Sequence, residues 1–173
     1  MTRLAGPETG NIGHGRDSKE KTAGAASVAP GERTRGEPMG EKLVKTEAQW
    51  RDRLSPEAYR VTRLGGTERS FAGRYHNCKD PGTYCCICCG QSLFSSETKY
   101  DSRTGWPSFW MPIGDEAIDE REDNALWMKR TEVACARCDA HLGHVFDDGP
   151  EPTGRRYCMN STAFVLKPDK GDE

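Results

Sequence analysis

The sequence has no tryptophan, tyrosine or phenylalanine before Trp50. Residues 1–40 contain eight glycines and three prolines, and their charged residues are of both signs. A segment of this composition cannot bury enough apolar surface to offset the entropy lost when its chain is ordered. We therefore expect a disordered tail at 1–40, one domain at 41–168 and a short C-terminal tail at 169–173.

The sequence also lacks an apolar run of about 18 residues, which excludes a membrane-spanning helix. Residues 1–40 have no apolar stretch suited to a secretory signal, and acidic residues such as Glu8 and Asp17 argue against a transit peptide. The formal net charge is −2, so no excess of positive charge indicates nucleic-acid binding. We expect a cytoplasmic monomer that binds neither membranes nor nucleic acid.

Helix signals are concentrated at the start of the expected domain. Residues 46–49 fit a capping box, Ser55 is followed by proline at the first helical position, and Gly65 can end the second helix. Short β-like runs separated by turn residues follow, with a helical insert expected around 115–124. This pattern predicts a mainly β fold with short helices at one end. The expected strands contain Tyr75, 83–84, 92–94, 131–135, 144–146, 156–160 and 163–166.

Eight cysteines stand out in a chain without a secretory signal, where this density indicates metal or redox chemistry rather than a disulfide framework. The C-x-x-C motif of Cys135 and Cys138 can supply two thiolates to a tetrahedral zinc ion. A second pair lies in CCICCG (85–90), which would complete a four-thiolate site. The alternative is that these cysteines are small buried apolar residues.

The CCICCG stretch offers two pairs with the same spacing, Cys85 with Cys88 and Cys86 with Cys89. Glycine often follows the second cysteine of a zinc knuckle, and Gly90 follows Cys89. We therefore expect Cys86 and Cys89 to be the ligands. Four protein thiolates leave no open coordination position, so the zinc would be structural.

Cys158, in GRRYCMNS (154–161), has no second cysteine near it in the sequence. It can be a buried thiol, a metal ligand or a nucleophile. Arg156 lies two residues away, so on a strand both side chains share one face, and a nearby cation lowers the pKa of a thiol. His141 and His144 of HLGH are structural, metal-binding or acid–base residues; the lone cysteine that follows favours acid–base chemistry.

GWPSFW (105–110) is the third unusual stretch, because proline removes a donor from a strand. Trp106 can be a core residue or can line a small apolar pocket for a ligand.

From about Trp50 to Leu166 the sequence resembles the methionine-R-sulfoxide reductases of the B type. The resemblance is carried by GTERSFAGRY, YCCICCGQSLFSSETKYDSRTGWPSF and RTEVACARCDAHLGHVFDDGPEPTGRRYCMNS. It implies two antiparallel sheets arranged as a β-tent and one zinc ion per chain. The zinc ligands implied by the resemblance are Cys86, Cys89, Cys135 and Cys138.

The resemblance also implies roles for the remaining residues. Cys158 would attack the sulfur of methionine-R-sulfoxide, in oxidised proteins or as the free amino acid, and become a sulfenic acid. His144 and His141 would help to protonate the sulfoxide oxygen. Thioredoxin or a similar thiol reductant would regenerate the enzyme. Asn160 and Arg156 would complete the site, Asp148 would support it by hydrogen bonding, and Trp106 would contact the methyl group of the substrate.

Two positions depart from the family's pattern. Thr104 occupies the place of the resolving cysteine found in many members, and Arg103 that of a glycine. Another thiol must then resolve the sulfenic acid, and Cys78 is the first candidate, ahead of Cys85 and Cys88; the alternative is direct reduction by an external thiol. A zinc-stabilised binding module and a thiol sensor are the competing functions; neither should reduce a sulfoxide catalytically, so turnover with dithiothreitol separates the enzyme from both.

Overall fold

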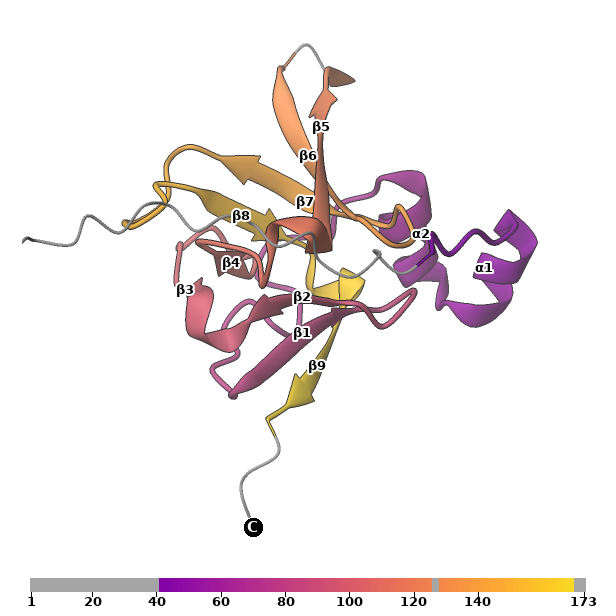
Figure 1. Cartoon of the computed structure of the whole chain (residues 1–173), viewed down its shortest axis with the longest axis horizontal. Coiled ribbons are helices and arrows are strands. Elements are labelled where there is room, and N and C mark those ends of the chain that lie inside the picture. The colour runs from indigo at the N-terminus through magenta and orange to yellow at the C-terminus, as the bar shows by residue number, and fades with distance from the viewer. Residues whose placement is uncertain (1–40, 126–127, 170–173) are drawn as a thin grey trace, which may run out of the picture. The chain divides into compact units, whose positions relative to one another are not determined.

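The computed structural model describes residues 41–125 and 128–169 (Figure 1). The expected disordered tail at 1–40 and residues 170–173 of the expected C-terminal tail lie outside the described residues. Within the described part, no helix is both long and apolar enough to cross a membrane.

Two helices open the described chain, α1 (Glu47–Arg53) and α2 (Pro56–Leu64). The side chain of Thr46 accepts a hydrogen bond from the Gln49 N–H, and the Gln49 side chain accepts one from the Thr46 N–H, so the expected capping box is confirmed. Ser55 caps α2 ahead of Pro56. Gly65 ends α2 with a φ of 67°, in the left-handed region that favours glycine.

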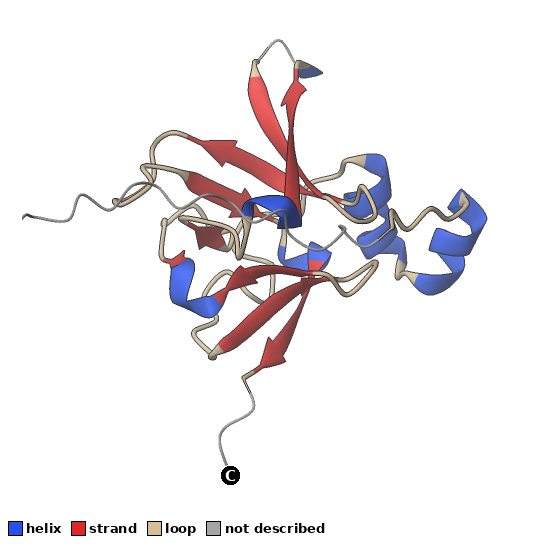
Figure 2. Cartoon of the chain, in the orientation of Figure 1, coloured by secondary structure: helices blue, strands red, loops and turns tan. Residues whose placement is uncertain are grey.

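All strand pairs are antiparallel and form two sheets, coloured red in Figure 2. This confirms the mainly β fold with two antiparallel sheets. The three-stranded sheet has the order β2 (Ser92–Ser95), β1 (Gly82–Cys86), β9 (Phe164–Pro168). The six-stranded sheet has the order β3 (Lys99–Tyr100), β4 (Ser108–Phe109), β8 (Arg156–Met159), β7 (His141–Phe146), β6 (Arg130–Cys135), β5 (Ile118–Asp123). Short 3-10 helices are η1 (Ser96–Thr98), η2 (Asp115–Ala117) and η4 (Ser161–Ala163).

Two sequence-based expectations about elements were wrong. The segment 115–124 is not a helical insert: it contains η2 and then β5, which pairs with β6 along its whole length. Long-range pairing determines this conformation, since the charged sequence of β5 has little strand preference of its own. Tyr75 lies in a turn rather than a strand, because its N–H donates to Oγ of Ser161 instead of to a neighbouring strand.

An aromatic core lies between the two sheets. Tyr84, Phe94 and Phe164 come from the three-stranded sheet, and Phe109 and Tyr157 come from β4 and β8 of the other. The rings of Tyr84 and Phe109 meet edge to face at 5.0 Å, and those of Phe94 and Phe109 stack at 4.6 Å. Because successive side chains of a strand point to opposite faces, the neighbours of Phe109 and Tyr157 face away from this core.

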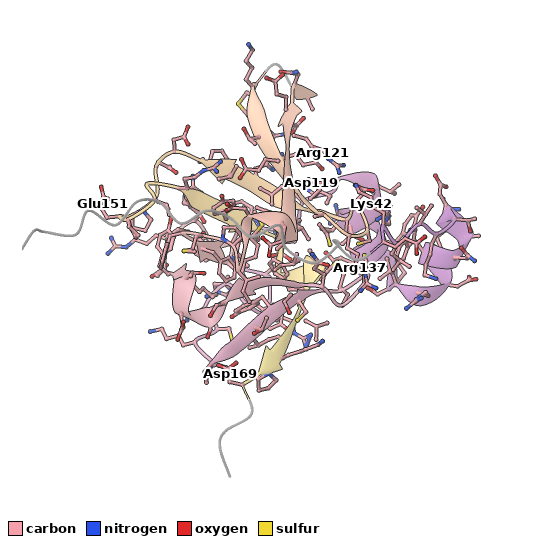
Figure 3. The ribbon with its side chains drawn as sticks, in the orientation of Figure 1. Lys42, Asp119, Arg121, Arg137, Glu151 and Asp169 are labelled. Atoms are coloured by element: carbon pink, nitrogen blue, oxygen red, sulfur yellow. The ribbon has the colours of Figure 1, made fainter. Side chains whose placement is uncertain are left out.

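Hydrogen bonds and ion pairs attach the start of the described chain to the rest of the domain. The N–H of Leu43 donates to the carbonyl of Arg137 at 2.7 Å. Figure 3 shows Lys42 near Asp119 and Arg121 of β5; Nζ of Lys42 lies 3.6 Å from Asp119 and 2.8 Å from Asp139. These ion pairs are exposed, so each contributes little stability. The backbone contact nevertheless places residues 42–43 beside the second C-x-x-C motif.

Candidate functional site

The two C-x-x-C motifs meet at the ends of β1 and β6, one in each sheet. Sγ atoms of Cys86, Cys89, Cys135 and Cys138 all lie within 4.8 Å of one another. Each motif ends in a turn of the same kind. The N–H of Gly90 donates to the carbonyl of Cys86, and the N–H of Asp139 donates to the carbonyl of Cys135. Gly90 and Asp139 both have a positive φ, 77° and 57°. The glycine that follows Cys89 thus has the backbone conformation expected of a metal knuckle.

Cys85 and Cys88 lie outside this cluster. The thiol of Cys85 contacts the Thr83 carbonyl at 3.8 Å, and the thiol of Cys88 donates to Oγ1 of Thr62 in α2 at 3.4 Å. The choice of Cys86 and Cys89 over the equally spaced alternative therefore agrees with the geometry. Four thiols at this spacing can hold one metal ion, and tetrahedral coordination by four sulfurs suits zinc.

Cys158 lies in β8, between β4 and β7. It pairs directly with Ser108 of β4 and with His144 of β7, and His144 pairs in turn with Glu132 of β6. Directly paired side chains share one face of a sheet, so these residues form a row across the face opposite the aromatic core. The pairing thus brings His144 beside Cys158.

A cavity of about 140 Å³ lies over this row. Its lining includes the predicted Cys158, His144, Asn160 and Trp106, together with Thr67 from the loop after α2. His141 lines an adjoining cavity of about 370 Å³ with His144, Asp123 and Glu132. The structure therefore gathers four of the predicted site residues around one small cavity and places His141 in the adjoining one.

Opposing effects act on the thiol of Cys158. Burial raises its pKa, while the charge of Arg156 and a hydrogen bond with Thr104 lower it; the net pKa is above the ordinary value for cysteine. Nε and Nη2 of Arg156 donate to the two oxygens of Asp148 at 2.8 and 3.0 Å. The guanidinium also lies over the ring of Phe146, 4.4 Å from its centroid. Asp148 thus holds Arg156 in place.

Both histidines bind a carboxylate. Nε2 of His144 lies 2.8 Å from Oδ2 of Asp123, the last residue of β5. Burial lowers the pKa of His144, and the hydrogen bond to Asp123 opposes this. Nδ1 of His141 lies 2.6 Å from Oε1 of Glu132, and the buried Nε2 of His141 has no protein partner in the described part of the chain.

Sequence reasoning missed Asp123 and Glu132. The pKa of Asp123 is lowered to about 2, first by the Ala125 N–H and then by His144, so Asp123 is a carboxylate at neutral pH. No local motif marks these acids, because the register of β5, β6 and β7 alone brings them to the histidines.

Trp106 and Asn160 are held by a third residue that the sequence did not indicate, Glu68. Nε1 of Trp106 donates to the carbonyl of Glu68 at 3.1 Å. Oδ1 of Asn160 accepts from the N–H of Glu68 at 3.0 Å, and Nδ2 of Asn160 donates to the carbonyl of Leu142 at 3.0 Å. Both ends of the Asn160 amide are therefore engaged within the protein.

Cys78 lies apart from the cavity around Cys158. It lines another cavity, of about 210 Å³, together with Lys99, Tyr100 and Asp101. Its thiol donates to Oδ2 of Asp80 at 3.5 Å. All eight cysteines, which fall within the described residues, are free thiols, so no disulfide joins Cys78 to Cys158.

The turn before Trp106 contains both departures noted in the sequence. Arg103 has a φ of 59°, a conformation that favours glycine, and its N–H donates to Oδ1 of Asp101 at 2.9 Å. Oγ1 of Thr104 lies 4.0 Å from Sγ of Cys158. The side chain at position 104 thus approaches the Cys158 thiol with a hydroxyl.

Comparisons with known proteins agree with this geometry. Residues 54–168 match the model of the SelR domain. The chain is 59% identical to the peptide methionine sulfoxide reductase MsrB of Acinetobacter baylyi over 133 residues, which cover 76% of this chain and 96% of the relative. It is 54% identical to the MsrB of Hahella chejuensis over 132 residues, 76% of this chain and 95% of the relative. The chain therefore belongs to the MsrB family of peptide methionine sulfoxide reductases and is an oxidoreductase.

Proposed function

We propose that the protein reduces the R epimer of methionine sulfoxide to methionine, with Cys158 as the nucleophile. The observation that carries the proposal is the small cavity in which the Cys158 thiol, His144 and Trp106 meet. Sulfur of Cys158 attacks the sulfur of the sulfoxide, and the S–O bond of the substrate breaks. The oxygen passes to Cys158, which becomes a sulfenic acid, while the substrate sulfur gains two electrons and leaves as a thioether.

His144 moves the proton that this reaction requires. A carboxylate only accepts hydrogen bonds, so Asp123 keeps a proton on Nε2 and leaves Nδ1 of His144 free to accept one. With the pKa of Cys158 raised and that of His144 lowered, the resting pair is a thiol and a neutral imidazole. His144 takes the thiol proton and delivers it to the sulfoxide oxygen, a poor leaving group until protonated. Glu132 holds His141 in the adjoining cavity, where His141 helps His144 to protonate the sulfoxide oxygen.

Trp106 and Arg156 complete the site in different ways. The indole of Trp106 lines the cavity and offers an apolar wall for the methyl group of the substrate. Arg156, held by Asp148, stabilises the thiolate as it forms. Asn160 contributes to catalysis by holding its neighbours in place, because its amide joins Glu68 to β7.

The four-cysteine cluster is proposed to hold one structural zinc ion. Cys86 ends β1 of the three-stranded sheet and Cys135 ends β6 of the six-stranded one, and Cys89 and Cys138 lie in the turns that follow these strands. When bound, zinc would connect the two sheets and have no open position for substrate.

Thioredoxin or a similar dithiol is proposed to return the sulfenic acid of Cys158 to a thiol, with release of water. Cys78 is proposed as the internal thiol that first condenses with Cys158. Mapping the disulfide of the oxidised enzyme by mass spectrometry tests this assignment: a partner other than Cys78, or a persistent sulfenic acid, contradicts it.

The function is tested with separate R and S epimers of methionine sulfoxide, free and within a peptide, with dithiothreitol as reductant. Turnover of the R epimer by the wild type and its loss in Cys158→Ser are expected. Activity on the S epimer, or full activity of Cys158→Ser, contradicts the proposal. A thiol sensor or a zinc-stabilised binding module would show no turnover in either form.

A further inference from the structure

Glu68 is a buried acid with an unusual set of partners. Glu68 is only 4% exposed, and the two oxygens of its side chain accept three hydrogen bonds. The donors are the N–H of Ser161 at 2.7 Å, the N–H of Thr162 at 3.0 Å and the hydroxyl of Thr162 at 2.8 Å. No lysine or arginine of the described chain forms a salt bridge with it. The carboxylate thus binds the start of η4, directly after Asn160.

The backbone of the same residue contacts two sides of the cavity around Cys158. Its N–H donates to Oδ1 of Asn160, and its carbonyl accepts from Nε1 of Trp106. One residue therefore fixes an amide at the end of β8 and an indole in the loop before β4. These two groups lie far apart in the sequence, and the sheet register alone does not orient either of them.

The loop that contains Glu68 has no helix or strand of its own between Gly65 and Gly82. It is held by contacts to the same two segments: the N–H of Phe71 donates to the carbonyl of Gly105, and the N–H of Tyr75 to Oγ of Ser161. A Cβ atom at Gly73 would lie 2.4 Å from Oε1 of Glu68 and 2.2 Å from Oγ of Ser161. Glycine at this position lets the loop close over the carboxylate.

We propose that Glu68 is a positioning residue of the active site. Its carboxylate fastens the loop to Ser161 and Thr162, and the loop backbone then holds the Asn160 amide and the Trp106 indole at the cavity. The effect of Glu68 on catalysis rests on the proposed sulfoxide reductase function. The effect on Trp106 does not, and it can be measured without substrate.

The first test is Glu68→Gln, with Glu57→Gln as the matched control. Glu57 lines a surface cavity with Glu68 but forms only an exposed ion pair with Arg60. In Glu68→Gln an amide N–H faces backbone donors, so the loop should loosen. We expect kcat/KM for the R epimer to fall roughly tenfold or more, mainly through KM, because Trp106 contacts substrate. The rate of Cys158 alkylation should stay within about twofold of the wild type, since Glu68 does not contact the thiol. An unchanged KM in Glu68→Gln overturns the proposal.

Thr162→Val gives a milder second variant, because it removes only the hydroxyl that donates to the carboxylate. Like Glu68→Gln, it should raise KM for the R epimer, by roughly threefold. NMR can measure hydrogen exchange of the Trp106 indole N–H, whose rate shows how firmly the loop holds the indole. Exchange should be faster in Glu68→Gln and Thr162→Val than in the wild type and Glu57→Gln; equal exchange in all four proteins overturns the proposal.

A double-mutant cycle separates positioning from a general loss of stability. Trp106→Phe removes the indole N–H that donates to Glu68. If Glu68 acts through Trp106, the fold-losses of Glu68→Gln and Trp106→Phe should not multiply in the double variant. Losses that multiply within about twofold contradict positioning. A wild type without activity on the R epimer would instead disprove the function, while the indole exchange would still decide the role of Glu68.

Discussion

Oγ1 of Thr104 lies 4.0 Å from Sγ of Cys158, so the side chain at position 104 contacts the thiol of Cys158 directly. Its hydroxyl can hydrogen-bond the thiol but cannot form a disulfide with it. Oxidised Cys158 must therefore meet a thiol from elsewhere, either from this chain or from the reductant.

Thr104→Cys should supply the missing thiol. After one turnover without reductant, we expect this variant to contain a disulfide between residues 104 and 158, because the two side chains already touch. Mass spectrometry should map this disulfide in Thr104→Cys, whereas the wild type and the control Thr104→Ser should contain the proposed disulfide between Cys78 and Cys158. The absence of a disulfide between residues 104 and 158 in Thr104→Cys contradicts the prediction.

The adjacent cysteines of the first motif should differ in metal binding. Cys86→Ser removes a member of the four-sulfur cluster, so the zinc content should fall from about one ion per chain to near zero. The midpoint of thermal unfolding should fall by roughly 10 °C or more.

Cys85→Ser and Cys88→Ser are the controls for this change. Neither thiol belongs to the cluster, so both variants should keep their zinc when measured by atomic emission. Loss of metal from Cys85→Ser alongside retention in Cys86→Ser would reassign the ligands.

Arg156→Ala should make Cys158 less reactive. The cation lowers the pKa of the thiol against the effect of burial, so removing it leaves the pKa higher and the thiolate scarcer at pH 8. We expect the rate of alkylation by iodoacetamide at pH 8 to fall by roughly threefold or more, and its rise with pH to move to higher pH. Arg155→Ala is the matched control, since Arg155 pairs with Glu120 and lies over the ring of Tyr157. An equal effect of both substitutions argues against a role for Arg156.

Asp123→Asn should impair proton transfer through His144. An asparagine can donate to Nε2 and so favour the other tautomer, and kcat should fall by roughly tenfold to a hundredfold. Asp123 raises the pKa of His144, so its loss lowers that pKa further. The acid limb of kcat/KM against pH should therefore move to lower pH, because neutral His144 accepts the thiol proton.

Asp119→Asn, on the same strand, is the control for Asp123→Asn. Asp119 pairs with Lys42 and Arg121 at the surface and forms no hydrogen bond with His141 or His144. Its pH profile should match that of the wild type. A profile of Asp123→Asn that also matches would show that the carboxylate does not act on His144.

The parts predictable from sequence are those determined by short stretches of chain. The caps at Thr46 and Ser55, the turn at Gly90 and the pairing of each C-x-x-C depend on residues a few positions apart. Such local rules give the same answer in most folds. GRRYCMNS by itself left Cys158 as a buried thiol, a metal ligand or a nucleophile, and its role as nucleophile stays a prediction that the family resemblance implies.

The parts that sequence reasoning missed depend on long-range register. β5 was mistaken for a helix because its charged residues follow no strand pattern, and its pairing with β6 creates it. Asp123 reaches His144 through the pairing of β5, β6 and β7, and Glu132 reaches His141 through the pairing of β6 with β7. Glu68 looked like any acid in a loop, since its donors lie more than ninety positions away, at Ser161 and Thr162.

β5 is an edge strand, paired on one side only, and Asp123 is its final residue. Edge strands separate from a sheet more readily than central ones, because fewer backbone hydrogen bonds must break. Each opening of this hairpin would release the carboxylate from His144 and leave the imidazole free to change tautomer. The proposed chemistry at Cys158, in a central strand, would thereby be coupled to the fraying of the outermost strand of the same sheet.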